Sequence, residues 1–323
     1  MVKKKKNPAV TALAEHTAQS LAQVPVQQYI MAATSDHTRR AYQSDVRQFI
    51  AWGGQLPCHT ENIVAYLHAQ ANKVNPRTLQ RYIVSLRQWH VTQGFADPTH
   101  HPLIKKTLTG IARTHGKPKV KAPAFTLDAI QRINQMLLQG ALCRDVRDRA
   151  LLLVGFFGAF RRSELVAINI DDITFFDEGV EIMVPRSKTD QTGEGRTCAI
   201  PKETGSLCPV TALQQWLAYL GETGPVFRRI TKTDDVLETG FTGQQVSLIV
   251  KRLAKMAALA NAEAYSGHSL RSGFATQARR QGADLVSIMR QGRWQSERTV
   301  MGYIEAGDAF AENAAGVILK SSD

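Results

Sequence analysis

The sequence has few cysteines and none in a metal-binding or disulfide-rich spacing. Its four cysteines, Cys58, Cys143, Cys198 and Cys208, form no CxxC pair. Scattered thiols of this kind are typical of reduced, mostly structural cysteines in an intracellular protein. We therefore expect neither a disulfide framework nor a zinc site.

Histidines do not suggest a metal site either. His100 and His101 are adjacent and precede Pro102, whereas two ligands on one helix commonly stand four residues apart. The sequence therefore predicts no bound metal.

Long apolar runs are absent. None approaches the roughly 18 consecutive apolar residues that a membrane span needs, and the longest run, 151–160, contains glycines and has charged neighbours. The lysines at positions 3–6 are not followed by the hydrophobic segment of a secretory signal. We expect a cytoplasmic protein without a membrane partner.

Acidic residues are scarce in the first part of the chain. Residues 1–124 contain 17 Lys and Arg but 5 Asp and Glu, whereas the remainder carries 23 of each sign. This imbalance indicates a part that binds a polyanion, joined to an electrically neutral part. A length of 323 residues agrees with two domains.

Helical periodicity recurs through the basic part. Residues 9–33 have a helical pattern interrupted at Pro25, and further helices are expected to begin near Asp36, Thr60, Asn75 and Pro102. In the helix after Asn75, the apolar face includes either Trp89 or His90. The other faces of these helices carry the cations that we expect to contact the DNA backbone: Arg39, Arg40, Arg47, Arg77, Arg81, Arg87, Lys105 and Lys106.

Composition also suggests where the domains divide. Residues 1–35 form a basic tail and a first helical segment, and residues 36–113, with part of 9–35, form a helical DNA-binding bundle. Residues 114–124, rich in lysine and containing two prolines and a glycine, are typical of a linker. Residues 125–323 then form the second domain.

The second domain is expected to be mostly helical. Helices are predicted from Thr126 and over 143–160, and a hairpin pairs strands 180–184 and 197–200. Helices then resume over 209–220, 242–261, 269–281, 285–291 and about 297–303. The fold class is mainly α, with a small antiparallel sheet in the second domain.

Several side chains near the C-terminus suit an anionic oxygen. His268 and Arg271 stand three residues apart at a helix start, where backbone N–H groups also favour an anion. Trp294 offers an indole N–H, and Tyr303, nine residues later, offers a hydroxyl that can act as a nucleophile. Together they suggest a pocket for a phosphodiester.

Further candidates precede this stretch. Arg161 follows a strongly apolar helix and requires an anionic partner or solvent, and Glu164 stands one turn later. Arg162 competes with Arg161 for the same role. Lys188 lies at the tip of the expected hairpin. Taken singly, each candidate also fits an ordinary structural role, such as a surface ion pair, a solvated lysine, a core tryptophan or a packed tyrosine.

The order of these motifs is more specific than any one of them. An arginine in GAFRRSEL, a hairpin lysine, GHSLR, GRW and a tyrosine nine residues after the tryptophan resemble the tyrosine recombinase (phage integrase) family. The resemblance covers about residues 36–310, in the two-domain form of the family. Many members have a second histidine where this chain has Trp294.

The resemblance implies a mechanism of DNA strand breakage and rejoining. Arg161 and Arg271 would clamp the scissile phosphate, with Glu164 orienting Arg161, and Tyr303 would attack phosphorus to give a 3′-phosphotyrosyl intermediate. His268 would serve as general base or phosphate donor.

Two further roles follow from the resemblance. Trp294 would donate its indole N–H to the phosphate, and Lys188 would protonate the departing 5′-oxygen. Arg186 and Lys202 are alternatives for the role of Lys188.

The family's chemistry and architecture imply the partners. Neither ATP nor a metal is required, so no cofactor is expected. The partner would be double-stranded DNA with inverted-repeat sites, bound by a homotetramer in a prokaryotic, phage or plasmid setting, associated with the nucleoid. Residues 307–319 could form a tail that docks on its own domain or on a neighbouring protomer.

Two alternatives stay open. A type IB topoisomerase uses the same phosphotyrosine chemistry but relaxes supercoils as a monomer. A non-catalytic DNA-binding protein would keep the fold without cleaving DNA. Relaxation of a supercoiled plasmid that lacks a target site would indicate a topoisomerase. Covalent attachment to DNA would exclude a non-catalytic DNA-binding protein.

Overall fold

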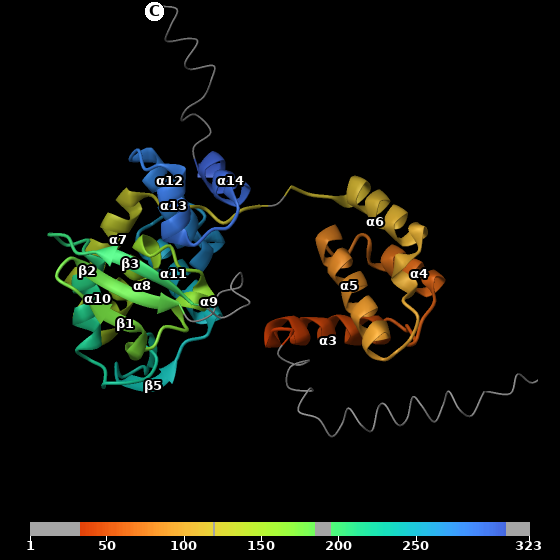
Figure 1. Ribbon diagram of the computed structural model, residues 1–323, viewed down its shortest axis with the longest axis horizontal. Helices are drawn as coiled ribbons and strands as arrows, with labels where there is room; N and C mark the ends of the chain where they lie inside the picture. The colour runs from red at the N-terminus through yellow and green to blue at the C-terminus, as the bar shows by residue number, and fades with distance from the viewer. Residues whose placement is uncertain (1–32, 119, 185–194, 308–323) are drawn as a thin grey trace, which may run out of the picture. The chain divides into compact units, whose positions relative to one another are not determined.

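The computed structural model describes residues 33–118, 120–184 and 195–307 (Figure 1). The chain divides into two compact units, Met1–Lys119 and Val120–Asp323. Lys188 and the tail over 307–319, apart from the helical backbone at 307, lie outside the described residues, as do positions 1–32.

The described part of the N-terminal unit contains four α-helices. Each expected start is present: the Ser35 hydroxyl accepts the Thr38 N–H at 3.3 Å, and the Asn75 side chain accepts the Arg77 N–H at 2.9 Å. Such caps satisfy backbone donors that the first turn leaves unpaired. The helices are α3 (Asp36–Ala51), α4 (Thr60–Gln70), α5 (Pro76–Thr92) and α6 (Pro102–His115).

Aromatic and aliphatic side chains from all four helices form the core of this unit. Phe49 of α3 meets Tyr66 of α4 edge-on, with ring centroids 5.1 Å apart. Of the two residues that the sequence left open, His90 is fully buried and Trp89 is partly exposed. The His90 ring accepts the Cys58 N–H at Nε2 (3.0 Å), which leaves Nδ1 to donate to the Leu86 carbonyl (2.8 Å).

A buried carboxylate ties α3 to α5. Asp45, 1% exposed, accepts two hydrogen bonds from the Arg81 guanidinium, at 2.8 and 2.9 Å, and one from the Ser85 hydroxyl at 2.7 Å. A bidentate arginine fork satisfies both carboxylate oxygens. Arg81 is therefore held by Asp45 as well as being a candidate for DNA contact.

A long buried helix, α8 (Cys143–Phe157), is the centre of the C-terminal unit. Every residue from Arg147 to Phe156 is buried, including the charged ones. Asp148 accepts hydrogen bonds from Arg147 and Arg252, and Arg149 donates to Asn134 Oδ1 at 2.9 Å. The charged residues Arg147, Asp148 and Arg149 are thus buried, because partners on this helix and on other elements satisfy them.

The described part of this unit contains six further helices of eight or more residues, of which α7, α10 and α12 pack directly on α8. They are α7 (Leu127–Gln139), α10 (Pro209–Leu217), α11 (Gly243–Met256), α12 (Gly267–Arg280), α13 (Leu285–Gly292) and α14 (Glu297–Gly307).

The sheet has three antiparallel strands in the order β1-β2-β3 (Figure 1). They are β1 (Ile173–Phe175), β2 (Gly179–Val184) and β3 (Arg196–Pro201). Alternate residues of β2 and β3 point into the core, as the period of two requires. The expected hairpin is present, whereas β1 and the separate pair β4 (Arg228–Ile230) and β5 (Val236–Gly240) were not predicted. The mainly helical fold class with small antiparallel sheets is confirmed.

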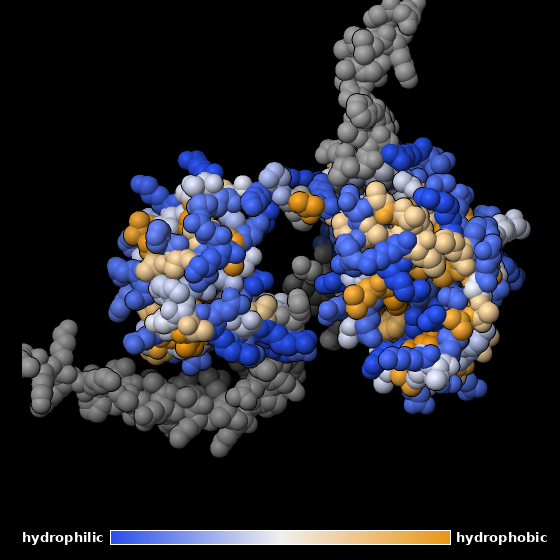
Figure 2. All heavy atoms as spheres, turned by 180° about the vertical axis from the view of Figure 1, so that it is seen from behind, coloured by the Kyte–Doolittle hydropathy of each residue, from blue (hydrophilic) through white to orange (hydrophobic). Residues whose placement is uncertain are grey.

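Hydrophilic and hydrophobic residues are mixed on the visible face of the two units. On the face shown in Figure 2, blue residues dominate and orange hydrophobic residues are scattered among them. Within the described ranges, no helix is both long enough and apolar enough to cross a membrane. All four cysteines are free thiols.

The Asp45–Arg81 pair gives a test of the N-terminal core. We expect Arg81→Met to lower the free energy of unfolding by roughly 1–3 kcal/mol, since a buried carboxylate loses its charged partner. Arg77→Met removes an exposed arginine from the same helix and should change the free energy of unfolding by less than about 0.5 kcal/mol. Chemical denaturation of the full chain measures both. Equal effects of the two substitutions would contradict a stabilising role for the pair.

Candidate active site

The end of α8 directs the chain toward the candidate site. The Ala159 N–H bonds the Phe156 carbonyl at 2.9 Å and the Phe160 N–H bonds the Gly155 carbonyl at 3.2 Å, which is the Schellman pattern of a helix end. Ala159 accordingly has φ +45°. The chain reverses there, and Arg161 becomes the N-cap of the short helix α9 (Arg162–Leu165).

A second Schellman motif ends α13. The Arg293 N–H bonds the Arg290 carbonyl at 3.1 Å and the Trp294 N–H bonds the Met289 carbonyl at 3.0 Å. Arg293 has φ +55°, a conformation that costs an L-residue roughly 1–2 kcal/mol relative to glycine. Any Cβ at Gly292 would overlap the Trp294 ring, so glycine is required there for the indole to pack.

Helices α12 and α14 contribute the remaining groups. The Ser266 hydroxyl caps α12 by accepting the His268 N–H at 3.3 Å, which starts the helix just before His268. The His268 and Tyr303 rings lie 5.2 Å apart between centroids, and the Thr276 hydroxyl donates to the Tyr303 carbonyl at 3.3 Å. Tyr303 of α14 is thus held beside α12, with its ring next to His268.

One buried carboxylate organises two of the arginines. Glu164 accepts hydrogen bonds from the Arg161 guanidinium, from the Arg161 backbone N–H at 3.0 Å and from Arg293 Nη2 at 3.2 Å. Burial by itself raises the pKa of the Glu164 carboxyl, but Arg293 and the Arg161 groups outweigh this and hold the pKa below its ordinary value. Glu164 is therefore ionised at neutral pH.

Arg271 is a buried cation that pairs with no carboxylate of the described residues. It is 1% exposed, its guanidinium donates to the Ala159 carbonyl, and it lies 4.1 Å from the centroid of the Trp294 ring. In the part of the chain that the structure describes, its Nη2 has no hydrogen-bond partner. Burial, with the nearby charge of Arg161, lowers the pKa of Arg271 to about 9. An unsatisfied buried donor on a cation is a site for an anion.

Tyr303 is half-buried, and its hydroxyl group is held in the neutral form. Burial raises the pKa of the Tyr303 phenol above its ordinary value, although Arg271 and Arg161 act in the opposite direction. The Tyr303 and Trp294 rings are 6.0 Å apart between centroids. Loss of the phenolic proton therefore needs a base or an added charge nearby.

The structure brings most of the predicted residues into one cluster: Arg161, Glu164, His268, Arg271, Trp294 and Tyr303. Lys188 and its alternative Arg186 lie outside the described residues. Arg162 is exposed and its side chain packs beside Gly243 and Gly267, away from Glu164.

Sequence reasoning missed Arg293. The motif Gly292-Arg293-Trp294 is part of the resemblance to the family, but it predicts a role for the tryptophan only. A positive φ and an ion pair with a residue 129 positions away leave no local signal in the sequence.

The predicted DNA-contacting cations of the N-terminal unit differ in their surroundings. Arg81 is bound to Asp45, and Arg87 Nε is 3.3 Å from Asp97 Oδ2. Arg39 pairs with Asp36 on the same helix. The remaining five are exposed: Arg40, Arg47, Arg77, Lys105 and Lys106.

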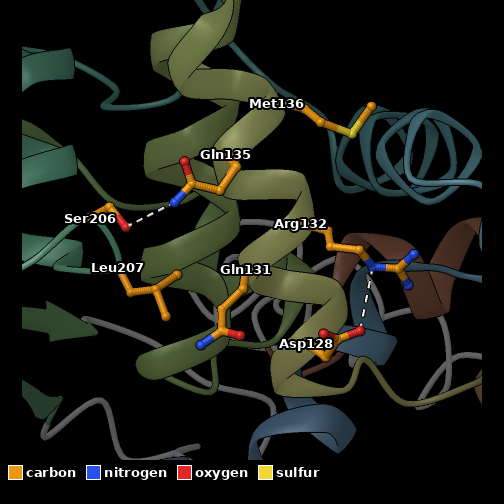
Figure 3. A pocket seen from close by; sticks show the side chains of 7 residues that line it. All are labelled: Asp128, Gln131, Arg132, Gln135, Met136, Ser206 and Leu207. Carbon is orange, nitrogen blue, oxygen red and sulfur yellow. Dashed lines mark hydrogen bonds and ion pairs between the residues drawn. The ribbon is translucent and has the colours of Figure 1, made fainter.

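A separate pocket of about 550 Å³ lies on the exposed side of α7 (Figure 3). Its lining includes Asp128 and Arg132, which pair at 3.4 Å, and Gln135, which donates to the Ser206 hydroxyl at 3.4 Å. None of the clustered site residues lines it. This pocket is therefore separate from the candidate active site.

The chain is similar to several known DNA recombinases. The Phage integrase family model matches residues 124–309. An integrase/recombinase xerD homolog of Selenomonas ruminantium is 35% identical, over 87% of this chain and 84% of that protein. Recombinase cre of Escherichia phage P1 is 25% identical, over 86% of each chain. A crystal structure of a lambda integrase tetramer bound to a Holliday junction has a TM-score of 0.55 at 18% identity, covering 91% of this chain and 76% of that one.

The family match and these relatives show a DNA-cleaving and rejoining enzyme. The chain belongs to the phage integrase family, the tyrosine recombinases.

The raised pKa of Tyr303 gives a test by titration. We expect the tyrosinate absorbance of the free protein, minus that of Tyr303→Phe, to show one ionisation above pH 10, because burial disfavours the phenolate. Circular dichroism at each pH checks that the protein is folded. An ionisation below pH 10 would show that the arginines outweigh burial.

Proposed function

We propose that this protein is a site-specific recombinase that acts through a covalent phosphotyrosyl intermediate. Family membership supports DNA recombination in general. The observation that supports the covalent step is the unpartnered Nη2 of buried Arg271, in the cluster that also contains Arg161 and Tyr303. An anion bound by Arg271 would be close to a potential nucleophile.

In the proposed cleavage step, the Tyr303 oxygen attacks the scissile phosphorus. A P–O bond to tyrosine forms as the bond to the 5′-oxygen breaks, which gives a 3′-phosphotyrosine and a 5′-hydroxyl. His268, whose ring contacts Tyr303, accepts the phenolic proton. Lys188 donates a proton to the departing 5′-oxygen. Rejoining reverses these transfers when the 5′-hydroxyl of another strand attacks the phosphotyrosine.

The clamped phosphate would be stabilised by Arg161, Arg271 and Trp294. Attack adds negative charge to the non-bridging oxygens, and fixed cations in a water-poor site stabilise such charge strongly. The Arg271 guanidinium is already desolvated and stacked on Trp294, so little reorganisation is needed when the phosphate enters. Energy of the broken diester is kept in the phosphotyrosine, so the proposed cycle needs neither ATP nor a metal.

The proposed partner is double-stranded DNA with inverted-repeat sites, bound by four copies of the chain. One structural neighbour is a tetramer bound to a Holliday junction, which supports this arrangement by analogy. The exposed cations of the N-terminal unit would bind the DNA backbone. Action on chromosomal, phage or plasmid DNA places the protein in the cytoplasm, at the nucleoid.

Covalent capture tests the proposed chemistry. A library of nicked duplexes with random sequence is incubated with the protein, and strands that stay attached after denaturation are sequenced. We expect a defined site and an adduct at Tyr303. The nick lets the short fragment that carries the new 5′-hydroxyl diffuse away, and this loss blocks religation. Tyr303→Phe should give no adduct, since it removes the nucleophilic oxygen.

Three outcomes would contradict the recombinase. An adduct that persists in Tyr303→Phe would exclude Tyr303 as the nucleophile. Efficient relaxation of a supercoiled plasmid lacking the captured site would favour a topoisomerase. The absence of any adduct would leave only DNA binding.

Salt dependence tests the proposed backbone contacts. Each phosphate neutralised should contribute about −0.9 to the slope of log K against log salt concentration, so Lys105→Gln and Lys106→Gln should each make the slope shallower by about that amount. Lys255→Gln is the matched control, because Lys255 is paired with Glu263 in the other unit. Binding constants on the captured site measure this. An unchanged slope in both variants would show that these lysines do not contact DNA phosphates.

A further inference from the structure

Arg293 is buried and directed into the protein. Its side chain is 2% exposed, and it donates to the carbonyls of Gly158 (3.1 Å) and Gln291 (2.9 Å) and to Glu164 Oε2 (3.2 Å). The guanidinium also lies 4.6 Å from the centroid of the Phe160 ring. Both terminal nitrogens of Arg293 therefore donate to acceptors of the protein itself, and within the described residues its Nε alone has no partner.

The position of Arg293 indicates that its side chain is needed. It occupies the left-handed residue of a Schellman motif, where glycine is the favoured residue because it has no Cβ. A lysine or arginine that only capped the helix end could lie at the surface. Here the backbone adopts a disfavoured conformation and the side chain reaches Glu164, which lies on α9.

Glu164 creates a problem that a second cation would solve. Its carboxylate holds Arg161 by both the guanidinium and the backbone N–H. With Arg161 as its only charged partner, Glu164 would cancel the positive charge that Arg161 offers to a phosphate. Arg293 supplies the compensating charge from the buried side.

We infer that Arg293 is a positioning residue: it offsets the Glu164 carboxylate, so that Arg161 stays oriented by Glu164 and still presents its charge to the scissile phosphate. This role rests on the proposed phosphoryl transfer.

Formal charge gives the role a measurable consequence. Arg161, Arg271 and Arg293 against Glu164 leave a net charge of +2, without counting His268. A phosphodiester carries one negative charge, and attack by a tyrosinate produces a phosphorane with two. The net charge of the full cluster therefore balances the two negative charges of the phosphorane. Without Arg293 the net charge is +1, which balances only the single charge of the substrate. Loss of Arg293 should slow cleavage while binding of DNA changes little.

Three variants separate charge from packing. Arg293→Met removes the charge and keeps an unbranched side chain. Arg293→Met combined with Glu164→Gln removes both charges and restores the net charge of +2. Arg290→Met is the matched control, because it removes an exposed arginine from the same helix.

Each variant is tested on two nicked duplexes that carry the captured site. One has the natural phosphate at the scissile position, and the other has a methylphosphonate, in which a methyl group replaces a charged oxygen. The measurements are the single-turnover rate of adduct formation with protein in excess, the DNA dissociation constant and thermal unfolding.

We expect Arg293→Met to slow cleavage of the phosphate substrate by roughly 10- to 100-fold, the usual effect of a group that supports a directly acting one. The loss on the methylphosphonate should be much smaller, because its transition state carries one negative charge fewer. The double variant should regain most of the lost rate on the phosphate, and Arg290→Met should match the wild type.

Equal losses on both substrates, or no recovery in the double variant, would overturn the inference and leave Arg293 as a packing residue. If Arg293→Met does not fold, the double variant decides alone: a loss relative to the wild type that is equal on the two substrates supports the charge argument, because the net charge is restored, and a larger loss on the phosphate refutes it. Failure of the wild type to form an adduct on the phosphate substrate would instead refute the proposed function itself, and the role of Arg293 with it.

Discussion

The arrangement of the site depends on a single buried carboxylate. Glu164 is 1% exposed and accepts hydrogen bonds from two arginines that come from different parts of the chain. An ionised carboxylate is tolerated at such depth only when cations and N–H groups satisfy it. The ion pairs therefore hold α9 against the end of α13, and with them Arg161 and Trp294.

Backbone conformation at two helix ends makes this arrangement possible. Ala159 and Arg293 both have positive φ in Schellman motifs, so α8 and α13 both end abruptly near the cluster. The reversed chain then places Arg161 after the first helix and Trp294 after the second. The Ala159 carbonyl, left free by the helix end, accepts a hydrogen bond from Arg271. Backbone carbonyls at the strained end of α8 thus hold two of the cations in place: Ala159 binds Arg271 and Gly158 binds Arg293.

Clustering of cations without enough anions is the electrostatic signature of the site. Arg271 keeps an unpartnered nitrogen in the interior, and the charge of Arg161 lowers its pKa further. In a protein without a ligand this arrangement costs stability, and it is maintained by the surrounding packing of α8, α12 and Trp294. A phosphate would offset the unfavourable charge, so binding and site architecture are coupled.

Local sequence patterns predicted much of the molecule. The helices after Ser35, Asn75 and Thr126 begin where their capping residues stand, because a cap acts within a few residues. Strands β1, β4 and β5 were missed: β1 and β4 are only three residues long, and the residues of β5 do not alternate between buried and exposed. The helix predicted over 143–160 ends at Phe157, since a left-handed residue other than glycine gives no warning in the sequence.

What the sequence determined by itself is the set of reactive groups and their order along the chain. Arg161, Glu164, His268, Arg271, Trp294 and Tyr303 were identifiable because each lies in a recognisable local motif. Tertiary structure alone decided which second arginine supports Glu164, that Arg271 Nη2 has no partner among the described residues, and that Arg162 is exposed. Those outcomes depend on contacts between residues more than 100 positions apart, such as Arg293 with Glu164 and Arg271 with Ala159. No local pattern encodes such pairings, because they arise only when the helices pack.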